Sequence, residues 1–530
     1  MSHLTGVARR LLRRIELFSQ YVLRMPLYEY QLAPLRAIVD SVRKQQGHDF
    51  LLIFPRQSGK NEAIAHLLVY LLNLFQRSGG AIVFAAIGDA VGRGLRRLEE
   101  RLENSWNEGR WRKGARPLRR TLGQASVVFL SSHPGAHARG ETAHWLLVVD
   151  ELQDNDAAHL EAVFEPMRAA NNATAVYIGT VRFRSDALWQ KKLALEQLQA
   201  EDGLRRVFMV TPEEVTAANP AYGRFLERKL ARLGRDHPIV RSEYFLQPID
   251  ADGGLFPPRR RRLMQGRHPR LETPDDAALY VATLDVGGQD EAATDPVARL
   301  QNPGRDYTVA TIFEVVAGEG DRDGPGGLPG PTYRAVDVFV DHGSRHFQDA
   351  PGRPALVKRL CAFLQQWRVA HVVADATGVG EGVVDWLAAS LGAARVTPFK
   401  FGQISKAQLG NRFLSLVETG RFHYWADEYE GAAGERARPY SDAWWFWQQC
   451  RHCTYQVPPG GAFDRHLSWG VPQTARVSTP QGPRPVHDDR LLSAALVAEY
   501  DRLIREGAVS VGRGESVVIP PLDPLREMGF

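Results

Sequence analysis

The 530-residue sequence has few cysteines and no long apolar run. Its three cysteines exclude a disulfide-stapled secreted scaffold and are typical of a reducing compartment. No stretch reaches the roughly 18 uncharged apolar residues of a membrane span. The amino terminus mixes arginines with leucines and lacks an apolar segment that ends in a small-residue cleavage site, so we expect no signal peptide. These absences predict a soluble, intracellular protein without a membrane anchor.

The sequence also lacks a strong charge bias and a convincing Cys or His metal pattern. Lys+Arg 66 against Asp+Glu 61 leaves a formal net charge of +5, which is compatible with a polyanionic partner but does not identify a DNA groove. Cys450 and Cys453 have a metal-like spacing, but no second cysteine pair exists, so zinc is not expected. The chain is long enough for two or three domains.

Short apolar runs alternate with helical patterns in the first half of the chain. The runs that we predict as strands are 50–54, 81–86, 126–130, 145–150 and 175–179, with helices such as 60–76 and 89–104 between them. This alternation is typical of an α/β fold in which helices cover both faces of a mostly parallel sheet. We place this first domain at residues 1–255.

A second series of elements follows a stretch rich in proline, glycine and arginine. That stretch, 256–274, is predicted as a basic linker, in which Arg259–Arg262 form either a solvated hinge or a contact with a phosphate backbone. Predicted strands then lie at 280–286, 308–316, 332–339, 371–375 and 395–399, and helices at 354–367, 382–391, 406–419 and 489–506. This order indicates a mixed sheet in a domain at 275–510, with a hairpin-tip insertion at Gly318–Gly330 and a loosely ordered tail at 511–530.

A candidate phosphate-binding loop joins the first predicted strand to the helix after it. The run reads FPRQSGKN, so backbone N–H groups and the positive helix end face an anion, and Lys60 reaches the outer phosphates. Phe54 and Asn61 depart from the usual G-x-x-x-x-G-K-[ST] pattern, although the Asn61 amide oxygen could serve Mg²⁺. Taken alone, the loop is equally compatible with an ordinary strand–helix turn. The candidate nucleotide-binding residues are Arg56, Gln57, Ser58, Gly59, Lys60 and Asn61.

Two acids at the end of a later apolar run strengthen the same interpretation. The run WLLVV precedes Asp150 and Glu151, and its continuous hydrophobicity is typical of a central parallel strand. Ligands bind at the carboxyl ends of such strands. Asp150 is therefore a candidate for holding Mg²⁺ through water, and Glu151 is a candidate catalytic base that orients the attacking water. A strand followed by an acidic helix cap is the structural alternative.

Four further polar residues are weaker candidates for the same site. Gln31 lies shortly before the loop and could read the adenine edge. Arg56 and Arg139 are candidates for stabilising the transferring phosphoryl group, in their own subunit or in a neighbouring one. Thr180 follows a predicted strand and could sense the γ-phosphate. Each of these alone carries little weight, because a lone arginine or glutamine is usually a surface residue.

A second group of acids lies in the carboxy-terminal domain. Asp285 and Asp375 each close an apolar strand, and Asp488–Asp489 open a helix with an apolar face. Converging ionised acids repel one another and are costly unless a cation neutralises them. Two Mg²⁺ or Mn²⁺ ions about 4 Å apart would do so and would clamp the attacking and leaving oxygens of a phosphodiester. The structural alternatives are strand-terminating turn acids and, for Asp488–Asp489, a helix N-cap.

The order of these motifs resembles that of the large subunit of the tailed-phage terminases. The motifs are PRQSGKNE, LLVVDE, YIGT, LDVGG, VADATGVGEGVVDWL and HDDRLLSAAL, and the resemblance extends from Leu27 to Tyr500. It implies an amino-terminal P-loop ATPase domain of the RecA/ASCE-like kind, which translocates double-stranded DNA into a procapsid. It also implies a carboxy-terminal RNase H-like nuclease domain, which cuts the DNA concatemer.

The resemblance further implies residue roles and partners. It makes Lys60 the phosphate-loop lysine, Asp150 and Glu151 the Mg²⁺ and catalytic acids, Thr180 the coupling residue and Arg139 a candidate trans-acting finger. It makes Asp285, Asp375 and Asp489 the nuclease triad, with Asp488 as a substitute or auxiliary ligand. The implied cofactors are ATP and Mg²⁺ at the first site and Mg²⁺ or Mn²⁺ at the second. The implied partners are double-stranded DNA, the capsid portal, the terminase small subunit and further copies of the chain in a pentameric ring, all in the host cell cytoplasm.

Two other functions are compatible with the residues. A helicase–nuclease of DNA repair or phage defence would share both sites but would separate strands. A two-core helicase needs a second RecA-like core, which the rest of the sequence does not offer. A binding scaffold in capsid assembly would use the first domain as a switch, and loss of catalysis would hardly affect it.

Overall fold

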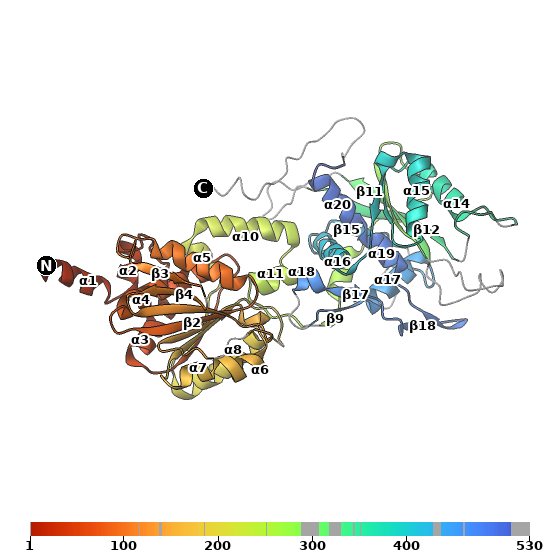
Figure 1. Cartoon of the computed structure of the whole chain (residues 1–530). Helices are drawn as coiled ribbons and strands as arrows, with labels where there is room; N and C mark the ends of the chain where they lie inside the picture. The colour runs from red at the N-terminus through yellow and green to blue at the C-terminus, as the bar shows by residue number, and fades with distance from the viewer. Residues whose placement is uncertain are drawn as a thin grey trace. The chain divides into compact units, whose positions relative to one another are not determined.

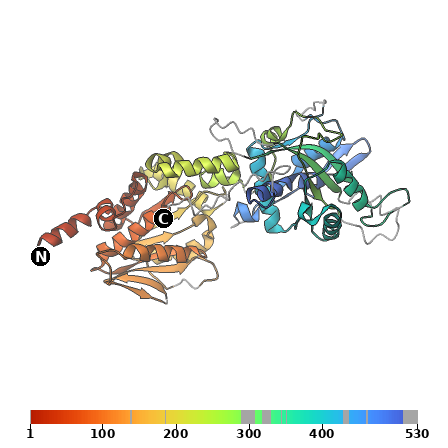
Figure 2. The same ribbon diagram turned by 90° about the horizontal axis from the view of Figure 1, so that it is seen from above.

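The chain forms two compact units (Figures 1 and 2). The computed structural model describes residues 2–115, 117–136, 140–184, 186–250, 252–287, 307–316, 330–342, 345–349, 351–427, 436–458 and 462–509. The first unit contains the chain up to Arg228 and the segment that begins at Pro238, and the second contains Lys229–His237 and most of the chain from Asp252 onward. No helix in the described ranges is long and apolar enough to cross a membrane.

The first unit is built on a mostly parallel sheet. In the described residues its strands lie in the order β3 (Trp111–Gly114), β4 (Leu118–Leu122), β5 (Ala125–Ser131), β2 (Gly80–Ala86), β6 (Leu146–Val149), β7 (Thr174–Gly179), β1 (Asp49–Ile53) and β8 (Val207–Met209). The central strands are almost wholly buried, as their continuous apolar sequences predict. Strand β7 lies between β1, which leads into the phosphate loop, and β6, which leads into Asp150. This order confirms the RecA/ASCE-like fold predicted for the first domain.

Helices cover both faces of this sheet. The helices of the unit are α1 (Ser2–Leu11), α2 (Ile15–Tyr21), α3 (Glu29–Lys44), α4 (Lys60–Phe75), α5 (Ala90–Leu102), η1 (Leu152–Asp154), α6 (Ala157–His159), η2 (Leu160–Phe164), α7 (Pro166–Ala169), α8 (Ala187–Asp202), α9 (Pro212–Ala218) and α11 (Pro238–Glu243), and α10 (Pro220–Leu233) begins here and ends in the second unit. Ser41 of α3 hydrogen-bonds Thr174 of β7 (2.7 Å), which fixes α3 to one face. Residues of η2, α7 and α8 pack against the other face. In Figure 1, α5 lies above the sheet and α6, α7 and α8 lie below it.

The second unit is built on a mixed sheet. Its described strands lie in the order β14 (Val396–Phe399), β13 (His371–Asp375), β10 (Tyr280–Asp285), β11 (Thr308–Val316), β12 (Thr332–Asp341) and β15 (Phe422–Tyr424). Strands β10, β11 and β12 form an antiparallel meander, and β13 and β14 run parallel to β10 on its other side. This arrangement confirms the predicted RNase H-like fold. It also brings the carboxyl ends of β10 and β13 to the same edge of the sheet.

Two groups of helices cover this second sheet. Helices α14 (Leu356–Gln366) and α15 (Gly380–Leu391) share one apolar core with it, and α16 (Gln403–Glu418), α17 (Asp442–His452), α19 (Asp489–Ala495) and α20 (Val497–Arg505) form the opposite layer. Figure 1 shows the two groups on either side of the strands. The remaining elements are β9 (Asp252–Gly254), α12 (Pro258–Met264), η3 (Ala393–Arg395), β16 (Thr454–Gln456), α18 (Phe463–His466), β17 (Ser468–Gly470), β18 (Arg476–Thr479) and β19 (Gly482–Pro485).

The segment 256–274, predicted as a linker, packs within the second unit. Met264 of α12 is fully buried, and Arg260 forms an ion pair with Glu418 of α16 (2.6 Å). Leu271 N donates a hydrogen bond to Val336 O of β12 (2.8 Å). The first two arginines of the basic run are thus held by acids of the same unit, because Arg259 also pairs with Glu418 (3.8 Å). The passage between the units falls earlier in the chain, within α10 and before Asp252.

Other predicted elements differ in detail or lie elsewhere. The predicted helix 489–506 is two helices, because a tightened turn at Leu496 separates α19 from α20. Apart from Gly330, the insertion predicted at Gly318–Gly330 lies outside the described residues, as does the tail at 511–530.

A buried ion network fixes α20 to the second sheet. The hydroxyl of Tyr333 on β12 donates to Asp501 Oδ1 (2.9 Å), Arg505 Nε donates to Oδ2 (2.8 Å), and Arg421 forms an ion pair with the same carboxylate. Burial alone raises the pKa of Asp501, but Arg421 and Arg505 outweigh it and hold the pKa below its ordinary value. The carboxylate therefore stabilises the unit above its ordinary pKa, and the contribution is lost as pH falls through the lowered value.

We expect Asp501→Ala to lower the free energy of unfolding of the second unit by about 3–5 kcal/mol at neutral pH, because it leaves Arg421 buried without this partner. Urea denaturation of the full chain measures the change. The control is Lys358→Ala, which removes only an exposed ion pair with Asp349 and should leave the free energy of unfolding close to the wild-type value. Equal stabilities of the two variants would contradict the assignment.

Candidate functional sites

The predicted phosphate loop connects β1 to α4 in the conformation that such a loop needs. Gly59 adopts φ +83° and Gln57 adopts φ +63°, both in the left-handed region. A Cβ at Gly59 would lie 2.6 Å from Gln31 Nε2, so a larger residue would displace Gln31 as well as strain the backbone. Helix α4 begins without a side-chain cap, and its first amide groups are therefore available to an anion.

Residues of the preceding segment hold this loop in place. Tyr30 Oη donates to Ser58 O (2.9 Å), and Gln31 Nε2 donates to Gly59 O (3.1 Å). Gln31 Oε1 accepts a hydrogen bond from Tyr28 N (2.9 Å). The structure thus places Gln31 against the phosphate loop as a support, and its reading of the adenine edge stays a prediction.

Lys60 lies beside the two acids that follow β6. Its Nζ is 3.2 Å from Glu151 Oε2 and 3.8 Å from Asp150 Oδ1. Burial raises the pKa of Asp150. Burial also acts on Glu151, but the charge of Lys60 and a hydrogen bond from Gln153 outweigh it and lower the pKa of Glu151. The structure brings the predicted lysine and both acids together, with Glu151 in the ionised form that a base requires.

The turn after β6 contains two supporting residues that the sequence did not single out. Glu151 adopts φ +50°, which is unusual for a non-glycine residue. Asn155 Nδ2 donates to the carbonyl oxygens of Asp150 (3.1 Å) and Glu151 (2.8 Å), which holds the turn. Gln153 Nε2 donates to Glu151 Oε2 (2.7 Å). The spacing D-E-x-Q is the one sequence signal that could have pointed to Gln153.

Asn61 tests whether this site suits Mg²⁺. Its Oδ1 is buried and has no hydrogen-bond partner, although a buried oxygen normally has one. An amide oxygen and a buried carboxylate such as Asp150, which lies 3.8 Å from the adjacent Lys60, are hard donors of the kind that Mg²⁺ prefers. The residues present therefore fit a magnesium–nucleotide complex.

The other candidates of the first site lie in different surroundings. The Arg56 guanidinium binds Glu243 of α11 through Nη1, at 2.9 Å and 2.7 Å from the two carboxylate oxygens. Thr180 follows β7, and its N–H donates to Gln153 Oε1 (3.2 Å). Ser58 Oγ donates to Pro55 O (2.6 Å) within the loop. Arg139 lies outside the described residues.

The second unit brings the predicted nuclease acids to one end of its sheet. Asp285 and Asp375 end β10 and β13, which are neighbouring parallel strands. Asp489 is the first residue of α19, which packs on this sheet through Ser493. Ser493 Oγ donates to Thr283 O (3.1 Å) and also hydrogen-bonds Thr311 Oγ1 (2.9 Å).

These acids are buried and affect one another. The exposed fractions are 7% for Asp285, 6% for Asp375 and 3% for Asp489. Burial, followed by the charges of Asp489, Asp375 and Asp488, raises the pKa of Asp285 well above its ordinary value. Burial also raises the pKa of Asp375, against hydrogen bonds that include one from Thr377 N (2.8 Å). Lys406 Nζ lies 3.5 Å from Asp488 Oδ2.

The donor set is suited to divalent cations. All four predicted ligands are carboxylates, which Mg²⁺ and Mn²⁺ favour, and a dication would offset the repulsion around Asp285. Within the described ranges, no group of three or more His, Cys, Asp or Glu side chains is arranged as a ready-made metal site. The carboxylates therefore neighbour one another without forming a completed ligand set, and the choice between Asp488 and Asp489 stays open.

Tyr307, which contacts Asp489, and two histidines beside its ring were not singled out from the sequence. Tyr307 N donates to Asp489 Oδ2 (3.0 Å). The Tyr307 ring lies 4.6 Å from the His342 ring and 6.0 Å from the His487 ring, measured between centroids. These residues come from three separate segments, so no local pattern could have grouped them.

The glycines after Asp375 have a structural reason. A Cβ at Gly380 would lie 2.4 Å from the carbonyl oxygen of Asp375, so glycine allows α15 to begin directly against the end of β13. Gly378 adopts φ +56° in the same turn. The run DATGVG thus makes the tight strand–helix turn that presents Asp375.

The cysteines and the tryptophans of α17 pack within the second unit. Cys361, Cys450 and Cys453 are buried. Trp447 is buried in the core, whereas Trp444 and Trp445 are partly buried at the start of α17.

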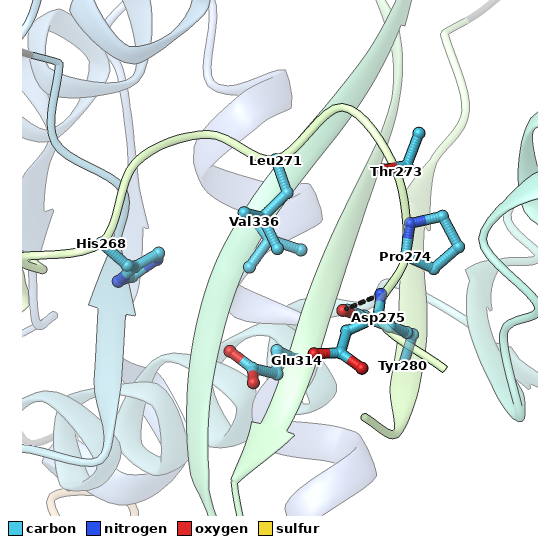
Figure 3. A pocket seen from close by; sticks show the side chains of 8 residues that line it. All are labelled: His268, Leu271, Thr273, Pro274, Asp275, Tyr280, Glu314 and Val336. Atoms are coloured by element: carbon cyan, nitrogen blue, oxygen red, sulfur yellow. Dashed lines mark hydrogen bonds between the residues drawn. The ribbon is translucent and has the colours of Figure 1, made fainter. Parts of the chain in front are cut away.

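A pocket of about 430 Å³ opens at the other end of β10 (Figure 3). Apolar side chains of Leu271 and Val336 and the carboxylates of Asp275 and Glu314 line it. The Tyr280 hydroxyl accepts a hydrogen bond from Asp275 N (3.0 Å) in its wall. Because Tyr280 begins β10 and Asp285 ends it, this pocket lies roughly 16 Å from the acid cluster and is not part of it.

No protein-family model and no curated protein matches the chain. Among solved structures, the chain is similar to the large terminase of a thermophilic bacteriophage, with a TM-score of 0.44 and 11% identity over 90% of this chain and 99% of that one. It is similar to the HK97 bacteriophage large terminase, with a TM-score of 0.37 and 14% identity over 92% and 99%. It is also similar to the magnesium-bound large terminase nuclease of the thermophilic phage G20c, with a TM-score of 0.29 and 18% identity over 46% and 96%.

These three structures come from the family that the motif order resembles.

Asp285→Asn should stabilise the second unit in the absence of divalent ions. The raised pKa of Asp285 means that the carboxylate destabilises the native state progressively as pH rises above its ordinary value. A neutral amide removes this cost, so we expect the free energy of unfolding at pH 8 in EDTA to rise by about 1–3 kcal/mol, with a smaller gain at pH 5.

Urea denaturation at the two pH values, with and without MgCl₂, measures this effect. Mg²⁺ should stabilise the wild type more than the Asn variant. Asp464→Asn, at an exposed position of α18, is the control and should change neither value. A variant no more stable than the wild type at pH 8 in EDTA would show that repulsion does not govern this cluster.

Proposed function

We propose that the chain is the large subunit of a phage terminase, which hydrolyses ATP to move double-stranded DNA into a procapsid and cuts the DNA with the help of divalent metal ions. The observation that carries the proposal is the presence of two distinct sites in one polypeptide. One unit sets a phosphate loop against two acids in a RecA/ASCE-like sheet, and the other gathers buried acids at one end of an RNase H-like sheet. The order of the sequence motifs supports the same family.

At the first site, the loop binds the phosphates of ATP, and the acids serve the hydrolysis. The backbone amide groups from Gln57 to Lys60, in the loop and at the start of α4, bind the phosphates. The Lys60 ammonium group leaves the two acids and pairs with the outer phosphates. Glu151 accepts the proton of the attacking water. Asn61 and Asp150 would hold Mg²⁺, which neutralises phosphate charge when bound.

Two arginines complete this assignment. Arg56 stabilises the transferring phosphoryl group in its own subunit after it separates from Glu243, and Arg139 does so in a neighbouring subunit of a ring. Thr180 responds to the γ-phosphate at the end of β7.

At the second site, Asp285, Asp375 and Asp489 would hold two divalent ions, Mg²⁺ or Mn²⁺, with Asp488 as an auxiliary ligand. Bound there, such ions activate water and stabilise the leaving oxygen of a phosphodiester. The amide groups of Thr377 and Tyr307 orient Asp375 and Asp489. The proposed partners are double-stranded DNA, the capsid portal, the small subunit and a pentameric ring of copies, in the host cell cytoplasm.

The competing functions have less support. A two-core helicase needs two RecA-like sheets, and the described part of the second unit has the RNase H-like order instead. A scaffold would not need Glu151 to be kept ionised beside the phosphate loop.

Separate substitutions should abolish the two activities independently. We expect Glu151→Ala to lower ATP turnover at least about 100-fold, because it removes the base, while metal-dependent DNA cleavage continues. Asp375→Ala should abolish cleavage and leave ATP turnover within about twofold of wild type. Phosphate release and nicking of plasmid DNA measure the two activities on the full chain.

Glu161→Ala and Asp464→Ala, at exposed positions of the same two units, are the controls and should retain both activities. The two-site assignment would be wrong if Glu151→Ala and Asp375→Ala left both activities intact. Absence of ATP turnover in the wild type, with and without DNA, would favour the scaffold.

Asn61 should act through Mg²⁺. We expect Asn61→Ala to raise the Mg²⁺ concentration needed for half-maximal ATP turnover by about tenfold, because it removes an oxygen donor, and Asn61→Ser to restore most of the affinity. Titration of ATP turnover with Mg²⁺ measures this. Asn73→Ala, a buried asparagine later in α4, is the matched control. A wild-type Mg²⁺ requirement in Asn61→Ala would exclude the role.

A further inference from the structure

Gln153 connects the predicted catalytic base to the end of a neighbouring strand. Its Nε2 donates to Glu151 Oε2 (2.7 Å), and its Oε1 accepts a hydrogen bond from Thr180 N (3.2 Å). A carboxylate can only accept and a backbone N–H can only donate, so these partners fix the orientation of the amide. One side chain thus joins the acid after β6 to the backbone after β7.

Burial and close packing restrict the side chain of Gln153. Its residue is 7% exposed. A Cβ at Gly179 would lie 2.3 Å from Gln153 Oε1, so the glycine that ends β7 makes room for this amide. Buried amide groups are costly without partners, and here both ends have one. The contact is therefore built into the turn.

The same turn makes a second contact with the chain after Thr180. Arg182 Nη1 donates to Asp154 Oδ1 (2.8 Å). Adjacent residues 153 and 154 therefore hold residues 180 and 182. If Glu151 moves, its hydrogen bond moves Gln153 as well. Gln153 in turn contacts the end of β7, which Asp154 also holds.

From there the contacts lead to the end of the first unit. Ile249 N donates to Arg182 O (3.0 Å), Arg184 N donates to Ile249 O (3.2 Å), and Phe183 pairs with Ile249 in a parallel bridge. Ile249 precedes by three residues Asp252, where the chain enters the second unit. Hydrogen bonds linked by one or two residues of backbone thus connect Glu151 to this segment.

We infer that Gln153 is a positioning residue that orients Glu151 for hydrolysis and transmits the nucleotide state of the site to Thr180 and on to the segment around Ile249. The inference rests on the proposed ATPase function. It assigns to one amide two tasks, of which the hydrogen bond to Glu151 serves the chemistry and the hydrogen bond from Thr180 serves the transmission.

Two substitutions separate these tasks. Gln153→Leu keeps the approximate volume and removes both hydrogen bonds. Gln153→Glu keeps an acceptor for Thr180 N–H but removes the donor to Glu151. We expect both to lower kcat for ATP about 10-fold or more, with KM within about twofold, because the phosphate loop is untouched.

Hydrogen exchange of the full chain measures the transmission. In the wild type, a non-hydrolysable ATP analogue should change the exchange of peptides that contain 180–184 and 247–250. In Gln153→Leu the analogue should bind with similar affinity, but the change at both peptides should be lost. In Gln153→Glu the change should be retained despite the lower kcat, a combination that a merely structural defect would not produce.

Gln199→Leu is the matched control. Gln199 Oε1 also accepts hydrogen bonds from the backbone, at Arg206 N (2.9 Å), but the residue does not contact Glu151. It should leave kcat and the exchange response unchanged. Thermal melting of each variant verifies folding.

The outcomes separate this inference from the proposed function. If the wild type hydrolyses ATP but Gln153→Leu has a wild-type kcat, or keeps the exchange response, the inference is wrong and the ATPase assignment stands. If the analogue changes neither peptide in the wild type, the transmission is likewise refuted. If the wild type neither binds nor hydrolyses ATP, the proposed function is wrong, and the inference, which rests on it, is wrong as well.

Discussion

Both candidate sites depend on the same constraint, which is that carboxylates at the carboxyl ends of buried strands need a compensating cation. A central parallel strand is covered on both faces, so an acid that follows it is removed from water. Asp150 and Asp285 both occupy such positions, and burial raises the pKa of each. The two sites differ in what supplies the positive charge.

In the first unit the compensating charge is part of the chain. Lys60 lies within 4 Å of Asp150 and Glu151, and it keeps Glu151 ionised. Because the same ammonium group is the expected partner of the outer phosphates, nucleotide binding and the charge state of the base are linked. In the second unit, Lys406 reaches Asp488 but does not offset the repulsion around Asp285, whose pKa stays well raised. A site with unbalanced carboxylates is stabilised by external cations, and this ties the proposed chemistry to divalent metal.

The sequence predicted the parts of each site that have local signals. Strand–turn–helix segments place Lys60 and Asp375, and buried apolar strands place Asp150 and Asp285, because hydrophobic runs and the residue after them are read along the chain. The supporting contacts have no such signal. Gln31 contacts Gly59 across 28 residues, and Tyr307 contacts Asp489 across 182. The segment 256–274 was predicted as a linker from its composition, but its Arg260 finds Glu418 158 residues away, which composition does not reveal.

The position of Gln153 shows how the order of strands determines what the site can transmit. Because β7 lies between β6 and β1, the strand next to the turn after β6 is β7 and not β1, which leads into the phosphate loop. An amide two residues after Glu151 can therefore contact the backbone of Thr180, while Glu151 itself contacts Lys60 from β1's loop. With β7 in this position, Glu151 has two sets of contacts. One leads through Lys60 to the phosphates, and the other leads through Gln153 to the segment around Ile249. A sheet in which β6 and β1 were neighbours would offer the first set without the second.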